Sequence, residues 1–240
     1  MTGAMNSDAD VRDRVRELRE RGFTPKQIAR AVGLAPAQAA RLVREIAANE
    51  VIDPTTRPVV ECWVSPGWST GLTVSGHPEW PGQSAAGDGS AGLAGVLLAR
   101  DAGRDRVSVC GWLVDGYCLG VKNDIGPTVE YRSSLPIMVR NFFSDFGGRP
   151  VAAPLELAQH LVLGAVDHAR GLGFEPAPEA DFAATRGHLG AWQGPSAIGF
   201  GRNGKPFYVS GPHDDVRRVL RQLERSVGAG NFDHLVGMSG

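Results

Sequence analysis

The sequence predicts an α+β protein in two parts, a small helical domain at residues 1–50 and a larger mixed domain at residues 51–240. Apolar residues recur at helical spacing through the first fifty positions. A stretch at 49–58, with two prolines and little apolar content, then marks a domain boundary. Beyond it, short β-type runs and helical repeats mix without the regular alternation that a doubly wound sheet requires.

The composition excludes several classes of protein. The 240 residues are 42% hydrophobic and 21% charged, with a net charge of −1, which suits a folded protein with a buried core. No apolar run approaches the ~20 residues of a membrane helix, and the first residues lack a secretory signal pattern. Three cysteines do not indicate a disulfide framework. We therefore expect a cytoplasmic protein without membrane contact.

The first helix is predicted from an apolar stripe that precedes a glycine. Val11, Val15 and Leu18 lie at i, i+4 and i+7 on one face, with charged residues on the other faces. Gly22 is expected to end this helix because glycine readily adopts the left-handed cap conformation.

A second helix is expected to begin after Thr24. Thr24 is a suitable N-cap, Pro25 suits the first turn, and Gln27 completes a capping box. The turn glycine is Gly33, and Pro36 begins a third helix. The inward residues of these two helices are expected to be Ile28, Ala29, Val32, Ala39, Leu42, Val43 and Ile46.

This spacing is that of a helix-turn-helix, and residues 10–48 resemble the three-helical, homeodomain-like helix-turn-helix family of bacterial regulators and recombinases. The resemblance implies that the third helix enters the DNA major groove. It rests on Ile28, Ala29, Val32, Gly33, Leu34, Ala39 and Leu42.

Five polar residues are the candidate DNA contacts. Gln38 suits an adenine edge, and Arg41 suits a guanine edge or a phosphate. Arg44, Lys26 and Arg30 suit backbone phosphates. Because two outward positions of the third helix are alanine, one copy should bind double-stranded DNA weakly, and a homodimer or a second basic surface would be needed. The alternative is a helical bundle used for protein contacts.

The larger domain is expected to contain strands at 59–64, 93–99 and 107–114, followed by residues 116–121 that continue the last strand or pair back on it. Residues 76–92 are rich in glycine and are expected to form a flexible loop.

Helices are expected at 134–146, 154–172 and 214–226. A hairpin is expected at 198–209, because Asn203-Gly204 is a strong two-residue turn signal. The last helix also carries a basic outer face that could contact phosphates, formed by Arg217, Arg218, Arg221 and Arg225.

The segment 110–124 (CGWLVDGYCLGVKND) contains the candidate catalytic residues Asp115, Cys118, Lys122 and Asp124. Lys122 could lower the pKa of a nucleophilic Cys118, and the two carboxylates could hold a divalent cation. The alternative is a buried cysteine beside an aspartate that caps a turn. This segment, with residues 200–212 and 228–232, resembles an uncharacterised bacterial α+β family, which implies no reaction.

The histidines and cysteines have no spacing that indicates a metal site, and we expect no metal and no cofactor, with a metal site assembled by the fold from distant residues as the open alternative. His160 and His168 share a helix but do not have the i, i+4 spacing of a zinc pair. His160 also falls almost opposite the apolar stripe and is expected to be exposed. The cysteines lack paired C-x-x-C spacing.

Two functions follow from these patterns. The first is a DNA-binding transcriptional regulator whose larger domain senses a ligand, dimerises or binds a partner. The alternative is an enzyme with its site at residues 115–124, recruited to nucleic acid by the small domain. The sequence identifies neither the DNA site nor any small-molecule ligand.

Overall fold

The computed structural model describes residues 23–39, 57–83, 92–177, 180–212 and 214–236, with residues 11, 14, 15, 17, 18, 21 and 42. The chain divides into two compact units, Met1–Ile52 and Asp53–Gly240. The N-terminal unit contains helix α2 (Pro25–Val32), and residues 36–39 and 42 are also helical. The three-helix arrangement depends partly on residues outside the described set and stays a prediction.

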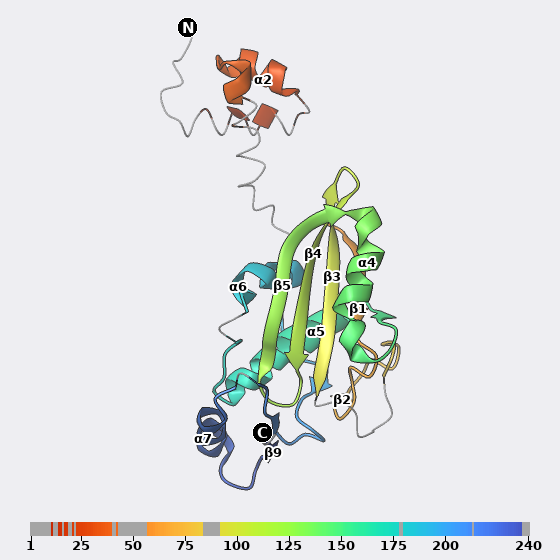
Figure 1. Ribbon diagram of the computed structural model, residues 1–240, viewed down its shortest axis with the longest axis vertical. Coiled ribbons are helices and arrows are strands. Elements are labelled where there is room, and N and C mark those ends of the chain that lie inside the picture. The colour runs from red at the N-terminus through yellow and green to blue at the C-terminus, as the bar shows by residue number, and fades with distance from the viewer. Residues whose placement is uncertain are drawn as a thin grey trace. The chain divides into compact units, whose positions relative to one another are not determined.

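The larger unit is built on a five-stranded antiparallel sheet, which makes the chain α+β as the sequence predicts (Figure 1). The strand order is β5–β4–β3–β1–β6. The strands are β1 (Val59–Val64), β3 (Leu93–Gly103), β4 (Arg106–Asp115), β5 (Gly120–Tyr131) and β6 (Val151–Ala152). The chain turns at residues 116–119, so β5 pairs back on β4.

Two helices cover opposite faces of this sheet, α5 (Leu155–Gly171) on one and α4 (Leu135–Phe142) on the other (Figure 1). Strand β3 serves both layers, because successive side chains point to opposite faces. Val96 and Leu98 belong to the core that contains α5, whereas Leu97 and Ala99 pack with α4. Burial on both faces explains the nearly continuous apolar sequence of this strand.

Smaller elements complete the unit. Strand β2 (Thr73–Val74) pairs with β7 (Ile198–Gly199), and β8 (Phe207–Val209) pairs with β9 (Asp233–Leu235). The remaining helices are α6 (Phe182–Thr185) and α7 (Val216–Val227), with 3-10 turns at Arg132–Ser134, Ser144–Phe146 and Arg186–Leu189. None of the helices in the described ranges has both the length and the apolar character needed to cross a membrane.

The hairpin predicted at residues 198–209 forms only at its tip, where Arg202 and Lys205 make an isolated antiparallel bridge, and its predicted strands do not pair with each other. The Asn203-Gly204 turn forms, with φ of 55° and 81°, but the flanking strands pair elsewhere, with β2 and with β9. The backbone N–H groups of Gly201 and Phe207 donate to the carbonyls of residues 116 and 117. The β4–β5 turn therefore takes the hydrogen bonds that a hairpin would have used.

Residues 76–83 and 92 are the described part of the loop predicted at 76–92, and residues 84–91 lie outside the described set. Trp80 in this part is buried, with 3% of its surface exposed. The Gln83 side-chain amide donates to the carbonyls of His77 and Trp80, and the Trp68 indole N–H donates to the Pro81 carbonyl at 3.0 Å. These contacts fasten the segment to the larger unit.

Candidate functional site

In the N-terminal unit, α2 has the ends that its sequence predicts. The Thr24 hydroxyl accepts from the backbone N–H of Gln27, and the Gln27 side chain accepts from the backbone N–H of Thr24, so the capping box is confirmed. Gly33 ends the helix in the left-handed conformation, with φ of 72°. Ile28 packs with Val15 and Leu18 in a small apolar cluster.

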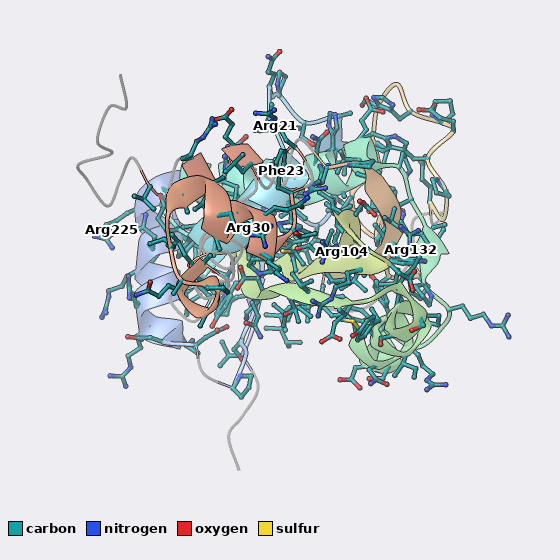
Figure 2. All side chains as sticks on the ribbon, turned by 90° about the horizontal axis from the view of Figure 1, so that it is seen from above. Arg21, Phe23, Arg30, Arg104, Arg132 and Arg225 are labelled. Carbon is teal, nitrogen blue, oxygen red and sulfur yellow. The ribbon has the colours of Figure 1, made fainter. Side chains whose placement is uncertain are left out.

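The predicted DNA-contacting residues of this unit lie partly within the described set. Lys26 and Arg30 are exposed on α2 and form no ion pair with a described residue. Figure 2 labels Arg30. Gln38 is exposed, but its side-chain oxygen accepts the backbone N–H of Ala35 at 3.3 Å, as in a helix-capping arrangement. Arg41 and Arg44 lie outside the described residues.

Asp115, in the segment 110–124, caps the turn that follows β4. Its side chain is 4% exposed and accepts backbone N–H groups from residues 117, 118 and 119 at 2.8, 3.1 and 3.2 Å. Burial raises the pKa of this carboxyl to about 6, against the opposing effect of the three N–H groups. The hydrogen bonds give Asp115 a structural role in joining β4 to β5.

Cys118 and Lys122 lie near Asp115, but each of the other three candidates is held by packing or by another side chain. Cys118 is fully buried in a cluster with Leu172 and Tyr208, and burial raises the pKa of its thiol, which is the opposite of activation. The Lys122 ammonium pairs with the Asp214 carboxylate at 3.1 Å. The Asp124 carboxylate accepts a hydrogen bond from the Thr185 hydroxyl. This hydroxyl in turn accepts a hydrogen bond from the Trp112 indole N–H.

We predict that no thiol of the native protein reacts rapidly with Ellman's reagent. Cys62, Cys110 and Cys118 are free and buried, and burial raises the pKa of the first two to about 12. Little thiolate is therefore present at neutral pH. Reaction should be slow in buffer and should reach three thiols in denaturant. Rapid stoichiometric labelling of Cys118 in the native protein would contradict this assignment.

A separate group of side chains meets beside the N-terminal end of α5. Glu156 and His160 are one helical turn apart, at i and i+4, so they share a face of α5. His77 comes from the segment between β2 and β3. One ligating atom from each of these residues lies within 4.8 Å of the others. The fold thus brings two imidazoles and a carboxylate together.

Aromatic rings hold the two imidazoles in place. The His77 ring stacks on Trp80, with centroids 4.1 Å apart and planes 11° from parallel. The His160 ring packs against Trp80 at 5.2 Å and meets the edge of Trp192 at 5.0 Å. The Trp192 indole N–H donates to Asp167 on α5 at 2.7 Å, which ties residue 192 to the same helix.

Hydrogen bonds orient each imidazole. Nδ1 of His77 lies 2.9 Å from a carboxylate oxygen of Glu79. Nδ1 of His160 accepts the backbone N–H of Ala197 at 2.8 Å, so the neutral His160 ring carries its proton on Nε2. Burial lowers the pKa of His160, while the nearby Glu156 carboxylate acts in the opposite direction. The ring is therefore neutral at neutral pH.

The prediction that His160 is exposed is wrong, because this side chain is half-buried among aromatic rings. The spacing of His160 and His168 along α5 does not indicate the group, since His168 is not part of it. The local signal was Glu156 four residues before His160. No spacing rule connects either residue to His77, which the fold alone brings to α5.

Comparison with protein-family models, with curated proteins and with solved structures finds no match for this chain. The two resemblances stated above therefore stay predictions from the sequence. The chain is defined by its own geometry, as an α+β protein with an N-terminal helical unit and a five-stranded antiparallel sheet between two helices.

Proposed function

We propose that the chain is a cytoplasmic DNA-binding protein, a transcriptional regulator that contacts double-stranded DNA through its N-terminal unit. The observation that carries the proposal is the junction at the end of α2. A capped helix ends at a left-handed Gly33, and helical residues resume at Pro36. Ile28, Ala29 and Ala39, the inward positions of a helix-turn-helix, are all buried.

The third helix is the proposed recognition helix. Gln38 is engaged with the backbone N–H of Ala35, so we assign base reading to Arg41. Arg44, Lys26 and Arg30 are assigned to phosphates, since phosphate contacts fix the position of a helix on the duplex without reading sequence.

The larger unit offers a second basic surface on α7. Arg217, Arg221 and Arg225 follow one another at i, i+4 and i+8, which spans about 12 Å along the helix. All three side chains and Arg218 are exposed and form no ion pair with a described residue. Figure 2 labels Arg225 on this helix. We propose that this stripe adds phosphate contacts, while the larger unit also senses a ligand, dimerises or binds a partner protein.

Replacing Arg41 and Arg44 by alanine should weaken binding to duplex DNA and reduce the magnitude of the salt slope, d log K/d log[salt], by roughly 1–2. When a phosphate contact is lost, fewer counterions are released from the DNA on binding. The measurement is fluorescence anisotropy of a labelled duplex, titrated with the full chain at several salt concentrations.

The matched control for this experiment is the double variant Arg140→Ala and Arg149→Ala. It removes the same charge from exposed positions on α4 and in the loop after it. The control should leave the slope unchanged. Equal effects of both double variants, or no effect of the first, would reject the proposed interface.

The alternative, an enzyme with its site at residues 115–124, gains no support from the geometry. Its thiol is buried with a raised pKa, and Asp115 and Lys122 are engaged by backbone N–H groups and by Asp214. We therefore do not extend the proposal to chemistry at this segment.

A further inference from the structure

The group formed by His77, Glu156 and His160 has the donor atoms of a transition-metal site. Two imidazole nitrogens and one carboxylate oxygen are a set that binds Zn²⁺ in proteins. Two of the donors come from one helix face and the third from a distant segment. None of these three residues is among those assigned to DNA, so the inference does not depend on the proposed function.

His77 is prepared for metal binding by its surroundings. Its Nδ1 lies 2.9 Å from the Glu79 carboxylate, which favours a proton on Nδ1 and leaves the lone pair of Nε2 free. A carboxylate behind a histidine is the usual outer partner of a metal-binding imidazole, since it fixes the ring and raises its basicity. Stacking on Trp80 further restricts the ring.

His160 needs a change of tautomer before it can bind a metal. Its Nδ1 accepts the Ala197 N–H, so the ring proton lies on Nε2. For Nε2 to bind the metal, it must lose this proton to solvent while Nδ1 gains one. The hydrogen bond from the Ala197 N–H to Nδ1 is then lost. An acceptor for the new N–H is at hand, because Ser196 Oγ lies 3.4 Å from Nδ1.

Ser196 has the capacity for that bond. Its hydroxyl donates to the His160 carbonyl at 3.0 Å and accepts the Ile198 N–H at 3.0 Å. A hydroxyl oxygen has two lone pairs, so one remains to accept from Nδ1. Metal binding at Nε2 therefore requires the His160 ring or residue 197 to shift, so that the two N–H groups separate and Nδ1–H bonds to Ser196 Oγ.

We propose that His77, Glu156 and His160 bind a divalent transition-metal ion, with Zn²⁺ the best match, and leave a fourth position for water. Ligands of tetrahedral zinc lie about 3.3 Å apart, because each is about 2.0–2.1 Å from the metal. The three ligating atoms lie within 4.8 Å of one another, so any pair farther apart than in tetrahedral zinc must approach, and Glu156 is exposed on its side of the group. Three protein ligands make this an open site rather than a closed structural one.

The test is calorimetric titration of the untagged, metal-free full chain with ZnCl₂, repeated with CoCl₂ while the visible absorption of bound Co²⁺ is recorded. We expect one equivalent of each ion to bind, with Co²⁺ bands typical of four or five ligands. His77→Ala and Glu156→Gln should each lower Zn²⁺ affinity on the order of 100-fold or more, and Glu79→Gln by about 10–100-fold.

The control variant is His234→Gln, which alters an exposed histidine outside the group and should bind Zn²⁺ as the native chain does. Glu156→Gln changes an exposed side chain, so its effect is not confused with loss of folding, which circular dichroism checks for every variant. Absence of zinc binding by the native chain would overturn the proposal. Zinc binding with native affinity in both single variants, His77→Ala and Glu156→Gln, would also overturn it.

Discussion

Replacing Gly164 by alanine should lower the free energy of unfolding by roughly 1–3 kcal/mol, although alanine is the better helix former. Gly164 lies inside α5, and a Cβ at this position would lie 2.6 Å from Cβ of Ser196 and 2.8 Å from the ring of Phe200. The helix backbone and the segment 196–200 must separate to admit the methyl group. Because Ser196 also contacts His160, the substitution should disturb the candidate metal site.

Gly171, in the same helix, provides a control at which alanine should change the free energy of unfolding in the opposite direction. It is exposed, and a Cβ there would meet nothing within 4 Å. Alanine at Gly171 should therefore raise the free energy of unfolding by about 0.5–1 kcal/mol, through the smaller backbone entropy of the unfolded chain.

Urea unfolding followed by tryptophan fluorescence measures both glycine substitutions in the larger unit alone, since all five tryptophans lie between residues 63 and 192. If alanine at Gly164 were as stable as alanine at Gly171, the close packing of α5 against residues 196–200 would be wrong.

Acid should destabilise the larger unit through His188. This side chain is 3% exposed, and its Nε2 lies 2.8 Å from the Ser108 hydroxyl. Its Nδ1 is buried without a hydrogen-bond partner among the described residues. Burial, followed by repulsion from the Arg100 guanidinium, lowers the pKa of His188 from 6.5 to about 4. The folded protein therefore holds this imidazole neutral where the unfolded chain would protonate it.

The sign of the effect follows from proton linkage. Between pH 6.5 and 4 the unfolded chain binds more protons at this residue, so the stabilising contribution is present above pH 6.5 and is lost as the pH falls toward 4. From these two pKa values, the loss between pH 7 and pH 5 is about 2 kcal/mol.

The His188→Gln variant should lack this contribution. The difference in unfolding free energy between native chain and variant should shrink by about 2 kcal/mol from pH 7 to pH 5, as measured by urea unfolding at both pH values. His234→Gln, at an exposed position, should show no such change. A difference for His188→Gln that is independent of pH would mean that His188 is not held neutral by the fold.

Local patterns in the sequence predict most of the secondary structure. The apolar repeat from Ala158 to Leu172 places α5 correctly, because a helix that packs on a sheet needs a continuous apolar face. The Thr24 capping box and Gly33 place the ends of α2 for the same kind of local reason. Asn203-Gly204 predicts its turn correctly, since both residues tolerate positive φ.

Pairing and site assembly could not be predicted in this way, because they depend on contacts between distant segments. The partner of β7 is β2, which no local turn signal indicates. The candidate catalytic residues around Cys118 are close in sequence, and this closeness suggests a reactive segment. Burial and hydrogen bonding in the fold determine the actual properties of these side chains. His77 joins Glu156 and His160 only through the fold.

The most direct test of DNA binding by the N-terminal unit is hydrogen–deuterium exchange of the full chain with and without a mixed-sequence duplex. A duplex concentration of about 100 µM covers most of the range of non-specific dissociation constants. We predict slower exchange at residues 24–44, and at residues 216–227 if the α7 stripe also binds. Unchanged exchange at residues 24–44 under these conditions would contradict this prediction.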